Sequence, residues 1–212
     1  MEYCYQENQV DPSLVAAPVR TGKRVVPVPL YIALFFLLVC INALVAKFAV
    51  FSFAMAPGVS LFYIVVALMI VFALWFGMYG AVAAYLGCYI GAGLLGGLPP
   101  DVSLYWSLAD FWQVIIPLLA FRYFACDPGI KNRRDLGVLV MFGIIINNVA
   151  GAAWGSVTLA LGGVVPWNEV LPVFYSWLLG NTAVCIVFVP AILYILTPVI
   201  RDHELYIRDY WH

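Results

Sequence analysis

Residues 32–53 read IALFFLLVCINALVAKFAVFSF, and Lys47 is the one charged side chain in this stretch. An α-helix needs about 20 apolar residues to cross the hydrocarbon core of a bilayer. The stretch therefore predicts a membrane-spanning helix. Five further apolar runs follow it, and the six expected spans cover about 30–54, 60–78, 80–96, 103–124, 136–162 and 171–198. The predicted fold class is all-α: a polytopic integral membrane bundle of about six transmembrane helices, embedded in the lipid bilayer.

Composition supports a membrane protein and excludes several other classes. Of the 212 residues, 65% are hydrophobic and 10% are charged, whereas a soluble domain carries about 25% charged residues. Six spans leave no room for a soluble catalytic domain, and a net charge of -1 offers no basic face for nucleic acid. The five cysteines are scattered without metal-ligand spacing, and both histidines lie in the C-terminal tail. We therefore expect no enzyme, no bound metal and no cofactor.

Basic residues predict the orientation. With six spans, the N-terminal tail, the loop at 126–135 and the C-terminal tail share one side of the membrane. That side holds Arg20, Lys23, Arg24, Lys131, Arg133, Arg134, Arg201 and Arg208. The loops of the other side contain no lysine or arginine, and their only charged residues are Asp101 and Glu169. Because basic loops stay in the cytoplasm, we expect cytoplasmic tails over 1–28 and 199–212, flanking a transmembrane domain over 29–198 in the cell membrane.

Polar side chains within the spans mark a candidate binding site for an unknown small molecule. Lys47 and Asp110 each lie about seven residues from the outer end of a helix, or ~10 Å deep, where they can pair. Charges at this depth are costly and often face a wet cavity, although a structural ion pair or a snorkelling side chain is the alternative. The second span carries almost no polar atoms and is expected to face lipid.

Three helices contribute to this predicted site. The spacing of Trp106, Asp110 and Gln113 puts them on one face of the fourth span, and Trp177 shares a face with Asn181 on the sixth. Asn147 and Asn148 lie near the middle of the fifth, where an interhelical hydrogen bond is the simpler interpretation. The full set of candidate ligand-binding residues is Lys47, Trp106, Asp110, Gln113, Asn147, Asn148, Trp177 and Asn181. A structural hydrogen-bond network is the alternative to a binding site.

Small residues indicate close helix packing on two spans. Gly143, Gly151 and Gly155 fall in a four-residue repeat on the fifth span, and Gly87 and Gly91 follow the same spacing on the third. Small residues at this spacing let two helix backbones approach closely. These five glycines are therefore the predicted helix-packing positions.

The region from Pro57 to Leu196 resembles the membrane-associated sensor (MASE-type) domains of bacterial and archaeal signalling proteins. The resemblance rests on Trp177, Gly180 and Asn181, which match a W-x-x-G-[DN] pattern, together with Pro190 and the turn Pro166-Trp167. It implies a sensor that passes its signal to a kinase, cyclase or phosphodiesterase output. This chain ends about fourteen residues after the last span, so such an output is expected to be a separate protein.

A second resemblance is to the substrate-binding S components of energy-coupling-factor transporters. It rests on the length, the six expected helices and the cytoplasmic termini. This resemblance implies an outer binding site for a vitamin or metal and a separate transmembrane coupling subunit as the partner. Both resemblances lead to the same expectation of an outer-facing polar pocket and a protein partner.

Overall fold

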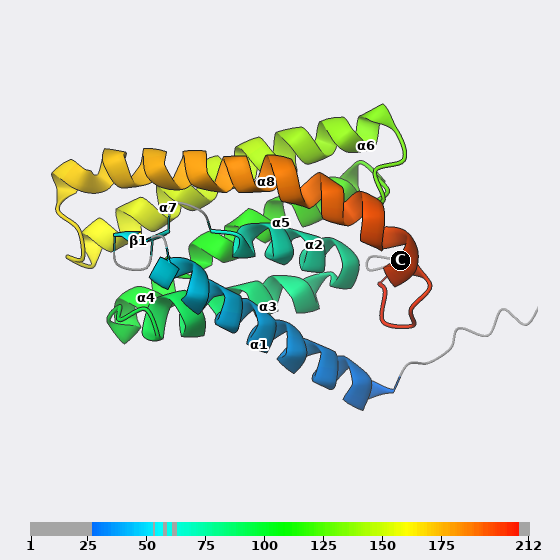
Figure 1. The fold of residues 1–212 in the computed structure, drawn as a ribbon, viewed down its shortest axis with the longest axis horizontal. Helices are drawn as coiled ribbons and strands as arrows, with labels where there is room; N and C mark the ends of the chain where they lie inside the picture. Colours follow the sequence, from blue (N-terminus) through cyan, green and yellow to red (C-terminus); the bar gives the residue numbers. More distant parts are fainter. Residues whose placement is uncertain (1–26, 53, 57–58, 61–62, 208–212) are drawn as a thin grey trace, which may run out of the picture.

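The computed structural model describes residues 27–52, 54–56, 59–60 and 63–207. Over these residues the chain is all-α, with six helical segments that pass back and forth along one axis (Figure 1). In chain order they are α1 (Val28–Ser52), α2 (Val65–Phe76), α3 (Met78–Cys88) with η2 (Tyr89–Leu94), α4 (Pro100–Trp106) with α5 (Leu108–Tyr123), α6 (Arg133–Val138) with η3 (Leu139–Ile146) and α7 (Asn147–Leu161), and α8 (Val170–Arg201). The strands β1 (Ala54–Ala56) and β2 (Val59–Ser60) pair between α1 and α2, and the short 3-10 helix η4 (Trp167–Glu169) precedes α8.

Four of the six segments are long and apolar enough to cross a membrane. They are Val28–Ala49, Pro100–Tyr123, Arg133–Leu161 and Trp167–Arg201. The prediction of six spanning helices is thus confirmed only in its coarser form, because Val65–Phe76 and Met78–Leu94 are shorter. At ~1.5 Å per residue α2 is about 18 Å long, well short of a ~30 Å hydrocarbon core. The predicted turn at Pro57-Gly58 lies outside the described residues.

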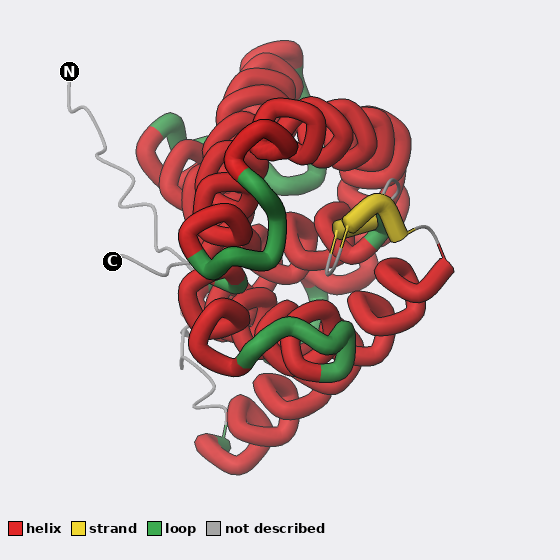
Figure 2. Tube along the Cα trace, turned by 90° about the vertical axis from the view of Figure 1, so that its left-hand side faces the viewer, coloured by secondary structure: helices red, strands yellow, loops and turns green. Residues whose placement is uncertain are grey.

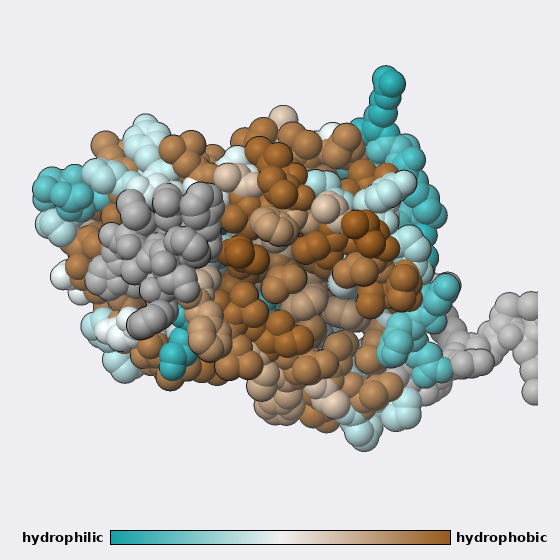
Figure 3. Space-filling model, viewed as in Figure 1, coloured by the Kyte–Doolittle hydropathy of each residue, from teal (hydrophilic) through white to brown (hydrophobic). Residues whose placement is uncertain are grey.

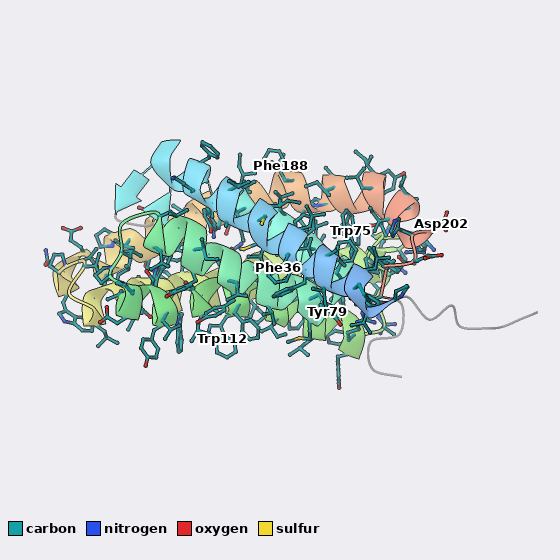
Figure 4. All side chains as sticks on the ribbon, turned by 90° about the horizontal axis from the view of Figure 1, so that it is seen from below. Phe36, Trp75, Tyr79, Trp112, Phe188 and Asp202 are labelled. Atoms are coloured by element: carbon teal, nitrogen blue, oxygen red, sulfur yellow. The ribbon has the colours of Figure 1, made fainter. Side chains whose placement is uncertain are left out.

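The surface has an apolar belt between two polar ends (Figure 3). Large apolar side chains such as Phe36, Leu179 and Ile195 are exposed on it, and Trp112 and Phe188 point outward from the bundle (Figure 4). An apolar surface of this extent is rare on a soluble monomer, so the structure supports a multi-pass membrane protein. We call the end that carries Lys131, Arg133, Arg134 and Arg201 the basic end, and the end that carries Asp101 and Glu169 the acidic end.

The helix α2 lies inside the bundle. All but two of its twelve residues are buried, and it contacts α1, α3, α5 and α8. The expectation that this segment faces lipid is therefore wrong. A helix that is apolar on every side is equally suited to lipid and to a protein core, and here neighbouring helices surround it. Its turn into α3 needs Gly77, whose φ is 58°.

Seen end-on, the helices form one bundle, with the two short strands at one side (Figure 2). The helices α2, α5, α7 and α8 form a ring, because α2 contacts α5, α5 contacts α7, α7 contacts α8, and α8 contacts α2. The helices α1 and α3 pack against each other and against α2, and α3 also contacts α5. Most of the buried polar side chains among the described residues belong to three of these helices, α5, α7 and α8.

At the basic end, ion pairs and a backbone hydrogen bond hold α8, the loop after α5 and the C-terminal tail together. Arg201, at the end of α8, pairs with Asp127 in the loop after α5, and Lys131 Nζ lies 3.0 Å from Asp127 Oδ2. Partial burial acts to raise the pKa of the Asp127 carboxyl, but hydrogen bonds from Arg201, Gly129 and Lys131 outweigh it and hold this pKa below its usual range. The tail after α8 also returns to α2, since Ile207 N donates to Trp75 O over 3.0 Å.

Candidate functional site

Asp110 is a buried carboxyl in the first turn of α5. Its exposed fraction is 1%, and Tyr63 Oη, just before α2, donates to its Oδ2 over 3.0 Å. The Cys88 thiol of α3 also interacts with Asp110 and with Ser107. Among the described residues Oδ1 of Asp110 has no hydrogen-bond partner. The carboxyl is therefore held in place through one oxygen, while the other is left open to a further donor.

Gln113, Asn147 and Asn148 form an amide cluster between α5 and α7. Gln113 Nε2 donates to Asn148 Oδ1 over 2.6 Å, and Asn147 Nδ2 donates to the backbone carbonyl of Gln113 over 3.1 Å. All three side chains are fully buried. An added Cβ on Gly151 would lie 2.4 Å from Gln113 Cγ. The glycine thus lets α7 approach the amide side chain of α5 closely.

The wide winding of η3 explains how two consecutive asparagines are both buried. The π-helical turns of Leu139–Ile146 end immediately before Asn147. Such turns shift the helical register and leave carbonyls without their usual partners. The carbonyl of Ile144 accepts from Asn148 Nδ2 over 2.8 Å, so the asparagine satisfies a group within its own helix while its oxygen accepts from Gln113.

Trp106 of α4 and Trp177 of α8 form a tryptophan pair. Their ring centroids are 5.6 Å apart with the planes tilted by 59°, and both side chains are buried. An added Cβ on Gly155 would lie 2.3 Å from the Trp177 ring, which therefore rests directly on the α7 backbone. Within the described structure neither indole N–H has an acceptor.

Asn181 lies one helical turn after Trp177 on α8. Its exposed fraction is 0%, and neither its amide nitrogen nor its amide oxygen has a partner among the described residues. A buried amide without hydrogen bonds is costly. One turn further along α8, the Cys185 thiol interacts with Asn148. On α8, Asn181 therefore lies between Trp177, which belongs to the tryptophan pair, and Cys185, which contacts the amide cluster.

Lys47 does not join these residues. Its side chain is exposed on α1, and no ion pair links it to Asp110 among the described residues, so the pair that the sequence allowed is not formed. A lysine near a helix end can extend its ammonium toward the membrane surface at little cost. The position of Lys47 along α1 gives its depth but not the direction in which its side chain points.

The structure adds residues that the sequence did not single out. Tyr63, Cys88 and Ser107 surround Asp110, and Asn42 of α1 is fully buried, donating to the Leu38 carbonyl over 2.9 Å. An added Cβ on Gly87 would lie 2.3 Å from Asn42 Cβ, and one on Gly91 would lie 2.2 Å from the Ala43 carbonyl. Asn42 could have been identified from the sequence, because it is a polar residue inside an apolar run. The contact between Tyr63 and Asp110 has no such signal in the sequence.

Two apolar grooves lie on the belt, away from these buried residues. One, of about 700 Å³, lies between α4 and α7 and is lined by residues that include Asp101, Tyr105 and Trp154. The other, of about 450 Å³, lies between α1 and α3, where Phe36 and Tyr79 line it (Figure 4). Their exposed, apolar linings suit lipid chains or a membrane partner.

Among the described residues, no group of three or more His, Cys, Asp or Glu side chains is arranged to hold a metal ion. Gly143 differs from the other four predicted packing glycines. The atom nearest to an added Cβ on Gly143 belongs to Leu139, one turn earlier on the same helical segment. The structure thus joins Gln113, Asn147 and Asn148 in one cluster and Trp106 and Trp177 in a pair. Asp110 on α5 and Asn181 on α8 are each buried as well. Comparison of the chain with models of protein families, with curated proteins and with solved structures finds no match.

Proposed function

We propose that this protein recognises a small molecule inside its helix bundle and acts as a membrane sensor that passes its signal to a separate protein. The proposed ligand-binding residues are Trp106, Asp110, Trp177 and Asn181. The amide cluster of Gln113, Asn147 and Asn148 would hold α5 and α7 in the required geometry. The resemblance to membrane-associated sensor domains, which rests on Trp177, Gly180 and Asn181, supports the same role.

The observation that carries the proposal is the set of buried polar atoms without partners. The amide of Asn181, both indole N–H groups and one oxygen of Asp110 are all in this state among the described residues. Lipid offers such groups no hydrogen bonds, and each unsatisfied group costs several kcal/mol at membrane depth. A bound polar molecule or ordered water would satisfy them, and polar residues retained at this depth are generally functional.

The proposed orientation places both termini in the cytoplasm of a cell whose membrane the bundle spans. It is supported by the basic residues at one end of the bundle and by the acidic residues at the other. The site then lies nearer the outer surface, because Trp106 and Trp177 belong to the halves of their segments that begin at the acidic end.

A thermal-shift screen of the purified protein in detergent tests this function. The screen uses vitamins, metal ions, amino acids, amines and aromatic metabolites. A ligand at a hundredfold excess over its Kd stabilises the folded state by about 2.7 kcal/mol. The shift should disappear in Asn181→Ala and persist in the matched control Leu179→Ala, which changes an exposed residue of the same helix. Absence of any hit, or a hit that survives Asn181→Ala, would refute the proposal.

An uptake role, as the S component of an energy-coupling-factor transporter, is the second candidate. The apolar groove between α1 and α3 near the basic end favours it, because a transmembrane coupling subunit needs such a surface. The two roles differ in what happens to the ligand. Accumulation of a radiolabelled hit in cells that express the chain with its natural partners would favour transport. A change in a partner's activity without accumulation would favour sensing.

A further inference from the structure

We propose that the ligand of the interior site is a small ammonium compound that also carries a hydroxyl or carboxylate acceptor. This inference rests on the proposed function, because it names the chemical class of molecule that the same residues bind. It draws on the buried carboxyl of Asp110 with its unpartnered oxygen, on the tryptophan pair and on the unpartnered amide of Asn181.

Among the described residues, no basic side chain pairs with Asp110. The side chains that act on it are Cys88 and Tyr63, and no lysine or arginine among the described residues does so. The described basic residues lie elsewhere: Lys47 is exposed on α1, and Arg122, Lys131, Arg133, Arg134 and Arg201 lie toward the basic end. A buried carboxylate without a partner is unfavourable, whereas a bound cation next to it compensates the charge. The unpartnered Oδ1 is the oxygen that would face the cationic nitrogen of the ligand.

The tryptophan pair provides both ring faces and donors. Trp106 precedes Asp110 by four residues on a segment interrupted only at Ser107, so the two side chains share one face. An indole face attracts ammonium groups through its quadrupole. The two indole N–H groups are donors without acceptors in the described structure, so an oxygen of the ligand would satisfy them. An ammonium compound with a hydroxyl or carboxylate satisfies the carboxyl and the indoles together.

The remaining surroundings limit the size of the ligand. Asn181 can both donate and accept, and therefore suits the polar end of such a molecule. The α7 backbone touches Gln113 and Trp177 at Gly151 and Gly155, and the α2 side of the ring is apolar. These close contacts favour a ligand of only a few heavy atoms.

Three pairs of probes isolate the ammonium group. Each pair differs by the exchange of nitrogen for carbon: choline and 3,3-dimethylbutanol, ethanolamine and 1-propanol, glycine and propionate. Binding is measured by thermal shift and titration calorimetry on the full-length protein in detergent. At least one ammonium probe should bind about tenfold or more tightly than its carbon partner, as expected for a charge pair combined with a cation–π contact.

Two variants assign the preference to the predicted atoms. Asp110→Asn keeps the shape of the side chain, and the two members of the pair should then bind within about threefold of each other, since the charge pair is lost. Trp177→Phe keeps a ring but removes the N–H donor and weakens the cation–π contact, so both members should weaken and their ratio should fall only in part. The unliganded melting temperature of each variant shows whether it has folded.

The possible outcomes separate this inference from the function on which it rests. If a neutral or anionic compound from the general screen binds at Asn181 while no ammonium probe binds, the assignment of an ammonium ligand is wrong and the proposed recognition of a small molecule stands. If the ammonium preference persists in Asp110→Asn, the role of that carboxyl is wrong. If no compound of any class binds, both proposals fall.

Discussion

At the scale of single residues, the close contacts of glycine set how near α7 lies to the candidate site. The four-residue repeat of Gly151 and Gly155 was readable in the sequence, and it predicted close packing without naming what is packed. The structure supplies the neighbours: Gln113 lies against Gly151, and the ring of Trp177 lies against Gly155. Both neighbours belong to the candidate site, so helix packing and the geometry of the site depend on the same glycines.

We predict that Gly155→Ala destabilises the protein and weakens ligand binding. The added methyl would lie 2.3 Å from a rigid, buried indole ring, and overpacking of this kind costs about 1–3 kcal/mol. The matched control is Gly137→Ala on α6, where nothing lies within 4 Å of the added Cβ. Thermal unfolding in detergent should show a lower melting temperature for the first variant and no loss for the second. Equal melting temperatures would mean that α7 does not pack on Trp177 as described.

Lys47 and Asp110 show which properties of a charged residue can be predicted from the sequence of a membrane helix. The depth of Lys47 and Asp110 follows from helical rise, but the direction of each side chain depends on how its helix is rotated. Trp106 on α4 and Gln113 on α5 share a face with Asp110 and indicate its inward side. On α1 the corresponding guide is Asn42, which lies five residues before Lys47 and is buried. Asp110 consequently lies inside and Lys47 outside, although the two have similar positions along their helices.

At the scale of elements, α2 connects the candidate site with the basic end. Tyr63, just before its first turn, donates to Asp110, and Trp75 in its last turn donates to Thr197 of α8 over 3.0 Å. The Trp75 carbonyl also accepts from Ile207 in the C-terminal tail. The sequence predicted this helix but not its position, because an apolar run has no polar atom that would show which neighbours surround it.

We predict a measurable coupling between Trp75 and Thr197 in a double-mutant cycle. Trp75→Phe leaves a buried hydroxyl without its donor, and Thr197→Val removes the acceptor. A neutral buried hydrogen bond contributes about 0.5–1.5 kcal/mol, so the double variant should be more stable by about that amount than the sum of the single changes predicts. Unfolding free energies in mixed detergent provide the measurement. Strictly additive effects would show that this bond does not join α2 to α8.

At the scale of the whole molecule, the alternation of apolar runs and polar breaks was sufficient to predict an all-α membrane bundle. The two short segments were harder to anticipate. Apolar composition continues from Ser60 to Met78, yet helix α2 begins only at Val65, after the strands β1 and β2. Hydropathy reports that a segment avoids water, but it does not distinguish a spanning helix from a shorter one enclosed by other helices.

Orientation in the membrane gives the last prediction. The loop that follows α5 carries Lys131, Arg133 and Arg134, while the opposite end carries Asp101 and Glu169, and basic loops remain on the cytoplasmic side. In a cysteine-free background, Asp101→Cys should react with a membrane-impermeant maleimide on intact cells. Lys131→Cys should react only after permeabilisation, and both side chains are exposed, so burial does not limit the reaction. Labelling of both positions from the same side would contradict the alternating path of the chain. Labelling of Lys131→Cys alone on intact cells would invert the bundle and move the candidate site to the cytoplasmic half.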